Sequence, residues 1–122
     1  MVVETRVNAD PEQLARALVE AAVDRKAADI ALLDLRAVTI ISDYFVLCNG
    51  GSERQINALV RALVEKAGEQ GYSSKRIEGV AEGGWVLLDF GDVIVHVFSP
   101  SQRAYYRLDE LWSHAQPVLV IQ

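Results

Sequence analysis

The sequence contains one cysteine, few lysines and no long apolar run, and each shortage excludes a class of protein. A lone Cys48 cannot form an intramolecular disulfide or a cysteine-based zinc cluster, which favours a reducing compartment. No apolar stretch approaches the roughly 20 residues that span a bilayer, and Met1–Glu4 does not begin like a signal peptide. We therefore expect a cytoplasmic protein.

The basic residues are too few and too scattered for a protein whose main role is binding nucleic acid. Nine arginines and three lysines are spread along 122 residues, and the net charge is −5. Extended contact with a phosphate backbone needs clustered Lys and Arg. This charge suits a basic protein partner better, and the length suits one domain with a single sizeable core.

The chain also lacks the residue groups that most enzyme and metal sites require. Gly50-Gly51-Ser52 precedes an expected helix, as in a nucleotidyltransferase, but no acid pair for two magnesium ions follows. Helix capping explains Ser52 fully. Asp89 and His96 could pair but have no nucleophile nearby, and His96 and His114 lack metal-ligand spacing. We expect no catalytic, cofactor-binding or metal-binding residues.

The stretch 85–98 carries the strongest structural signal, because two apolar runs flank Gly91-Asp92. A two-residue loop of Gly and Asp between such runs predicts a β-hairpin, since glycine accepts positive φ without a Cβ clash. The predicted cross-strand pairs are Phe90–Val93, Asp89–Ile94, Leu88–Val95, Leu87–His96, Val86–Val97 and Trp85–Phe98.

The two faces of this hairpin differ in chemistry, because side chains alternate along a strand. One face has no polar side-chain atom and must be core: Val86, Leu88, Phe90, Val93, Val95 and Val97. The other face, here called the Trp85 face, comprises Trp85, Leu87, Asp89, Ile94, His96 and Phe98. Such a mixture fits a recognition surface, and it equally fits a sheet face that lies under a helix.

The remaining pattern predicts an α/β fold: one domain with a mixed β-sheet of about five strands packed with helices. The expected helices begin at Asp10-Pro11, Ser52 and Ser99-Pro100, and the expected strands besides the hairpin are 30–35, 43–48 and, more weakly, 72–79. The second strand, the second helix and 72–79 should form a βαβ crossover. We predict a leader over 1–9, a domain over 10–115 and a tail over 116–122.

Several segments together resemble the ribosomal silencing factor family, also called iojap-like. The resemblance covers about Leu14 to Trp112. Its segments are Lys26-Ala27-Ala28-Asp29-Ile30, Ser42-Asp43-Tyr44-Phe45-Val46, Gly51-Ser52-Glu53-Arg54-Gln55, Glu78-Gly79, the whole hairpin, and the closing pattern Arg103, Tyr106, Leu108, Leu111, Trp112.

The resemblance implies a non-enzymatic translational repressor with a nucleotidyltransferase-like topology that lacks the catalytic acids. Such factors bind the large ribosomal subunit through its ribosomal protein fourteen (L14), block joining of the small subunit and repress translation when nutrients are scarce. On this basis we expect the Trp85 face to contact L14, with Trp85 as anchor and Leu87, Ile94 and Phe98 as apolar area. Asp89 and Glu78 would pair with basic groups, and His96 would orient a hydrogen bond.

Two alternatives remain at this point. The first is a nucleotidyltransferase-like enzyme or nucleotide-binding module, which a nucleotide titration would reveal. The second is a homodimer built on the Trp85 face, in which dimer formation and partner binding would compete.

Overall fold

The computed structural model describes residues 9–122, so residues 1–8 of the predicted leader lie outside the described part. The elements, in chain order, are α1 (Pro11–Asp24), β1 (Ala28–Asp34), β2 (Tyr44–Asn49), α2 (Glu53–Glu69), β3 (Arg76–Glu78), the 3-10 turn η1 (Ala81–Gly83), β4 (Trp85–Asp89), β5 (Val93–Phe98), α3 (Pro100–Tyr106), α4 (Leu108–Leu111) and β6 (Gln116–Ile121).

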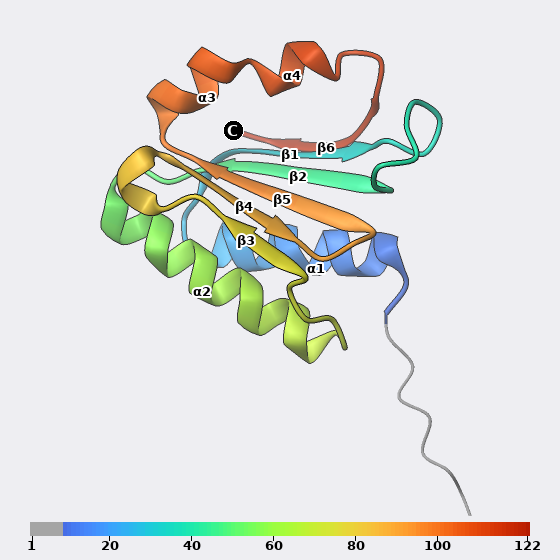
Figure 1. Ribbon diagram of the computed structural model, residues 1–122, viewed down its shortest axis with the longest axis horizontal. Helices are drawn as coiled ribbons and strands as arrows, with labels where there is room; N and C mark the ends of the chain where they lie inside the picture. The colour runs from blue at the N-terminus through green and yellow to red at the C-terminus, as the bar shows by residue number, and fades with distance from the viewer. Residues whose placement is uncertain (1–8) are drawn as a thin grey trace, which may run out of the picture.

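The strands form one mixed sheet in the order β3-β4-β5-β2-β1-β6. β2 and β5 are parallel, and every other neighbouring pair is antiparallel. α1 and α2 cover one face of the sheet, whereas α3 and α4 lie over the other (Figure 1). The α/β fold is confirmed, with six strands where the sequence predicted about five.

The hairpin of β4 and β5 has the register that the turn chemistry predicted. Trp85 pairs with Phe98, Leu87 with His96 and Asp89 with Ile94. Gly91 has φ +90 in the turn, a conformation that glycine adopts without strain. The wholly apolar face of the hairpin is buried in the core beneath α1 and α2, as expected.

The long helices begin where the capping residues predicted. Asp10 Oδ1 accepts from Gln13 N at 2.8 Å, Asp10 N donates to Gln13 Oε1 at 3.2 Å, and Pro11 occupies the first turn of α1. Ser52 Oγ accepts from Gln55 N at 3.1 Å and caps α2. The buried apolar residues of both helices pack against the sheet in the main core.

The chain after Ser99 differs from the single helix that the spacing of its apolar residues predicted. Arg107 adopts φ 53, a left-handed conformation that ends α3 and begins the short α4. The break lets Leu108 and Trp112 reach a second, smaller core on the far face of the sheet, where Phe45 and Trp112 meet edge to face at 5.4 Å. This cover determines how much of the Trp85 face stays accessible.

Two segments at the sheet edges correct the predicted organisation. Within 72–79 only Arg76–Glu78 forms a strand, β3, which pairs with β4. β3 runs parallel to β2, as a βαβ crossover requires, but β4 and β5 lie between them. The segment 116–122, predicted to be a tail outside the domain, instead supplies β6 and pairs with β1. The domain therefore extends through Ile121.

Candidate functional site

Trp85 lies near one edge of the sheet, half-buried on the face that carries α3 and α4. Its Nε1 donates to His96 Nδ1 at 3.1 Å. The indole stacks on Phe98 with ring centroids 5.1 Å apart and touches Tyr106 of α3 at 4.4 Å. One side of the ring is thus fixed by this chain, and the rest of its surface remains available to a partner.

His96 is a buried neutral base that holds the indole in place. The side chain is 4% exposed, and burial, assisted by the charge of Arg103, lowers the pKa of His96 to about 4. Because the indole N–H can only donate, Nδ1 must accept, and the proton of the neutral ring then sits on Nε2. Nε2 has no hydrogen-bond partner within the described residues.

The predicted contact residues divide into an accessible group and a buried group. Trp85, Leu87 and Asp89 are half-buried, and Glu78 is exposed. Ile94, His96 and Phe98 are buried, Phe98 completely, because the smaller core beneath α3 and α4 encloses that half of the face. The helical cover therefore lies over the β5 half of the Trp85 face, and a strip along β4 stays accessible.

A shallow depression of about 190 Å³ marks the accessible strip. Glu78, Gly79, Trp85 and Leu87 line it. Gly79, which sequence reasoning did not assign to the site, has φ +85, and a Cβ there would lie 2.1 Å from the carbonyl oxygen of Trp85. Glycine is therefore required for β3 to approach β4 this closely.

The rim of the depression carries both signs of charge. Arg76 lies 3.8 Å from the Asp89 carboxylate and 3.7 Å from that of Glu78. Asp89 also accepts from the backbone N–H of Gly91 at 2.8 Å, so one of its oxygens serves the turn. Sequence reasoning assigned Arg76 and Tyr106 no role in the site. The pairing of Arg76 with Asp89 becomes visible only once the register of β3 is known.

The sequence of this chain matches a known protein family over nearly its whole length. The family described as "Ribosomal silencing factor during starvation" matches residues 8–122. The chain belongs to this family.

Individual members of the ribosomal silencing factor family align over most of the chain. The ribosomal silencing factor of Halalkalibacterium halodurans is 42% identical over 107 residues, covering 88% of this chain and 92% of that protein. A crystal structure from Chromobacterium violaceum superposes with a TM-score of 0.82 at 33% identity, covering 93% and 95% of the two chains. The mouse "Mitochondrial assembly of ribosomal large subunit protein 1" is 32% identical, covering 79% of this chain and 43% of that protein.

The Gly50-Gly51-Ser52 loop of this silencing-factor chain takes part in structural hydrogen bonds. Ser52 caps α2. The side chain of Gln55 accepts from Gly51 N at 2.6 Å and donates to the carbonyl oxygens of Arg25 and Lys26, at 3.2 and 3.0 Å. The loop thereby anchors the C-terminal end of α1.

The other side chains that could react are hydrogen-bonded within the chain or buried in its core. His96 is bonded to Trp85 rather than to Asp89, so the two do not form an acid–base pair. Cys48 is fully buried, and burial raises the pKa of its thiol to about 12. Residues 9–122 contain no group of three His, Cys, Asp or Glu side chains placed to hold a metal ion. No helix among them is long and apolar enough to cross a membrane.

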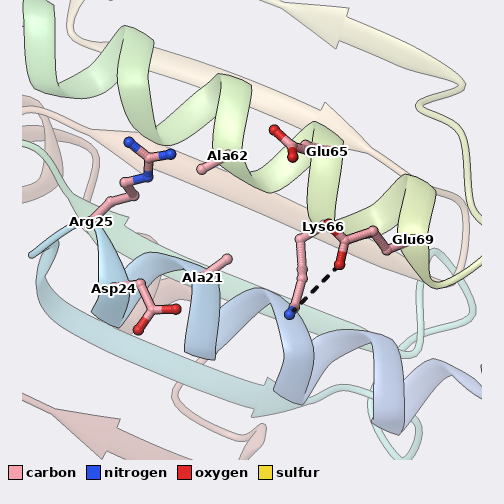
Figure 2. A pocket seen from close by; sticks show the side chains of 7 residues that line it. All are labelled: Ala21, Asp24, Arg25, Ala62, Glu65, Lys66 and Glu69. Carbon is pink, nitrogen blue, oxygen red and sulfur yellow. Dashed lines mark ion pairs between the residues drawn. The ribbon is translucent and has the colours of Figure 1, made fainter.

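A second hollow lies between α1 and α2 and is lined by charged side chains of both signs (Figure 2). Its volume is about 140 Å³, and Asp24, Arg25, Glu65, Lys66 and Glu69 surround it. Lys66 reaches Glu69 at 4.0 Å, an ion pair within one turn of α2. The mixed charges are typical of a solvated helix–helix boundary.

Proposed function

We propose that this chain binds the large ribosomal subunit through ribosomal protein L14 and sterically blocks joining of the small subunit, which represses translation under nutrient limitation. Membership of the ribosomal silencing factor family supports the ribosomal role. The name of the mouse relative, which refers to the large ribosomal subunit, supports the choice of subunit. We propose a cytoplasmic location for this activity.

The contact proposed for L14 is the accessible strip of the Trp85 face. The observation that carries this assignment is the open depression beside a half-buried tryptophan whose inner side is fixed by His96 and Phe98. An anchored aromatic residue loses little side-chain freedom on binding, and tryptophan is enriched among binding hot spots. Leu87 adds apolar area next to it.

The buried members of the face lie behind the proposed contact. His96 and Phe98 support the indole through a hydrogen bond and ring stacking. Ile94 is buried in the same small core, opposite Asp89. Glu78 is exposed at the rim and is available to a basic group, whereas Asp89 is shared with Arg76 and the turn. The net charge of −5 would assist encounter with a basic partner.

The proposed mechanism is steric and requires no catalysis. The loop that resembles a nucleotidyltransferase anchors α1 and α2, and Ser52 serves as a cap. Titration with nucleoside triphosphates, followed by NMR, tests this point: saturable shifts around Gly51 and Ser52 would favour the nucleotide-binding alternative.

The direct test is a sedimentation assay with purified ribosomal subunits and the full chain. We expect the protein to sediment with the large subunit and to reduce the fraction of joined ribosomes. Leu87→Ala should weaken both effects about tenfold, because Leu87 lines the depression. Ile77→Ala is the matched control, since Ile77 pairs with Leu88 and lies on the opposite face of the same sheet edge.

Two results would contradict the proposal. One is normal subunit joining with the protein in large excess. The other is equal loss of binding in Leu87→Ala and Ile77→Ala. That result would mean that binding to the large subunit depends on this edge of the sheet as a whole and not on the Trp85 face.

A further inference from the structure

The layer formed by α1 and α2 is narrower than the sheet that it covers (Figure 1). α1 packs mainly over β1 and β2, and α2 packs over β4 and β5. Neighbouring strands lie about 4.8 Å apart and packed helices about 8–10 Å apart, so each helix covers about two strands. β6, the outermost strand beside β1, therefore has no helix of its own beneath it within residues 9–122.

The uncovered strip is a groove lined by apolar side chains. Its volume is about 360 Å³, and it runs between β6 and α1. Leu119 and Ile121 of β6 line it on the side of the main core. Val23 of α1 lines it as well and is 45% exposed. An apolar groove with polar side chains around it is typical of a surface that a partner covers.

The groove has the length of a short helix. α1 has 14 residues, which span about 21 Å, and β6 has 6 residues, which span about 20 Å. α1 runs along the strands of the sheet, so both walls extend in the same direction (Figure 1). A helix of about four turns would fill the groove from end to end.

The free edge of β6 is less suited to an added strand than its face is to a helix. The register between β1 and β6 shifts between Leu32 and Leu33, and Pro117 lies in the first turn of the ladder. Irregular register and proline are features that protect edge strands from pairing. The groove on the face of β6, and not the edge, is therefore the better docking surface.

The rim of the groove is acidic. Arg16 donates to Glu12 at 3.0 Å, so the one basic residue of the lining is already paired. Glu20 and Asp24 follow one and two turns further along α1 and form no ion pair with any of residues 9–122. Lys or Arg side chains on the flanks of a bound helix would complement these carboxylates and fix its position.

We propose that the groove between α1 and β6 binds a basic amphipathic α-helix of another protein. The apolar stripe of that helix packs on Val23, Leu119 and Ile121, and its basic side chains face Glu20 and Asp24. The bound helix extends the layer of α1 and α2 over β6. The proposal does not depend on the contact proposed for L14, because the strip along β4 lies on the other face of the sheet, toward its other edge.

Fluorescence anisotropy of the full chain with a synthetic peptide tests the groove directly. The probe is a blocked peptide of about 18 residues with Leu at helical three- and four-residue spacing, Lys on both flanks and Ala elsewhere. We expect saturable binding of one peptide per chain. A peptide of the same composition in scrambled order, and one with Glu in place of Lys, should bind at least about tenfold more weakly.

A substitution in the wall of the groove locates the bound peptide. Val23→Asn should weaken binding about fivefold or more, because it removes apolar contact area. Valine and asparagine have similar helix propensities, so α1 should persist, which circular dichroism checks. Val38→Asn is the matched control, since Val38 is an exposed valine of the β1–β2 loop and does not line the groove.

A second pair of variants tests the charge of the rim. Glu20→Gln should weaken binding of the peptide about threefold at low salt, and the difference should shrink at high salt. Glu65→Gln changes the net charge equally but lies in the hollow between α1 and α2 (Figure 2). This control should bind the peptide like the wild type.

Photo-cross-linking in the cells that make the protein identifies the natural occupant. A photoreactive amino acid replaces Val23 in one full chain and Val38 in the control, and mass spectrometry reads the segment that is attached. We expect attachment from position 23 to a segment of another protein with apolar residues at three- and four-residue spacing and Lys or Arg on its flanks.

Four outcomes would overturn the proposal. The Leu and Lys peptide fails to bind, or it binds Val23→Asn as tightly as the wild type. The segment attached at position 23 alternates apolar and polar residues, as an added strand does. That segment comes from a second copy of this chain. Position 23 yields no attachment beyond that of position 38.

Discussion

At the scale of a single residue, Trp85 combines internal contacts with a proposed role in binding. Its indole N–H satisfies His96 and its ring packs on Phe98 and Tyr106, so truncation removes internal contacts as well as the proposed anchor. We expect Trp85→Ala to lower the free energy of unfolding by about 2 kcal/mol and to weaken subunit binding by about 2 kcal/mol, roughly thirtyfold.

Urea unfolding and a binding titration measure the two effects of Trp85→Ala separately. Trp85→Phe is the matched variant, because it keeps an aromatic ring but leaves Nδ1 of His96 without its donor. A Trp85→Ala protein that binds subunits normally would remove Trp85 from the proposed contact.

His96 makes stability depend on pH in a defined window. The pKa of its imidazole is lowered from 6.5 to about 4 in the folded chain, so between these values the unfolded chain binds the proton more strongly. The free energy of unfolding should have its full value above about pH 6.5 and should fall by about 3 kcal/mol as the pH decreases toward 4. Urea unfolding of the wild type and His96→Phe across this range checks the prediction; the variant should lose much less.

At the scale of a single element, Gly79 lets β3 lie close to β4 and so shapes the depression beside Trp85. Alanine at this position places a Cβ against the Trp85 carbonyl at φ +85, so β3 must move away from β4. We expect Gly79→Ala to lower the free energy of unfolding by about 2 kcal/mol or more and to reduce subunit binding. Gly83→Ala is the control, because a Cβ there meets nothing within 4 Å; similar losses in both variants in thermal unfolding would contradict this role.

Arg103 fastens the helical cover of α3 and α4 to the sheet. Its guanidinium donates to Asp109 at 2.8 and 3.0 Å, to Asn49 Oδ1 at 2.9 Å and to the carbonyl oxygen of Asp29 at 2.7 Å. The carboxylate of Asp109 gains from the same contact, since the side-chain hydrogen bond from Arg103 lowers the pKa of Asp109.

Lysine cannot reproduce this planar set of hydrogen bonds. Arg103→Lys should cost about 2 kcal/mol and speed amide hydrogen exchange across 99–112, measured by mass spectrometry. Arg107→Lys is the matched control, because the Arg107 side chain is largely exposed and lies 3.8 Å from the equally exposed Glu110. Unchanged exchange in Arg103→Lys would mean that packing of Leu108 and Trp112 alone holds the cover.

The elements that local chemistry dictates were predictable, and those that depend on distant contacts were not. Gly91 fixed the hairpin register, and Asp10 and Ser52 fixed two helix starts, because each acts within four residues. The network of Arg103 joins residues 54 and 74 positions apart in sequence, which no local pattern encodes.

The same reason explains the partial prediction of the site. Alternation sorted the Trp85 face correctly, but whether a helix covers it depends on the left-handed Arg107, for which the sequence offers no glycine signal. Likewise, Pro117 in a short apolar segment concealed β6, whose partner β1 lies more than 80 residues earlier.

At the scale of the whole molecule, the sheet holds the proposed contact far from β6. Three strands lie between β4 and β6, which places the Trp85 strip roughly 19 Å from the outer edge by strand spacing alone. We therefore expect Val120→Lys, a change at an exposed position of β6, to leave binding to the large subunit as tight as in the wild type.

Sedimentation of Val120→Lys and Leu87→Ala with purified large subunits measures this difference. A contact confined to the Trp85 strip predicts weaker binding of Leu87→Ala alone, because the two positions lie toward opposite ends of the sheet. Equal loss of binding in both variants would mean that the contact extends across the sheet, or that either substitution disturbs the whole fold, which circular dichroism distinguishes.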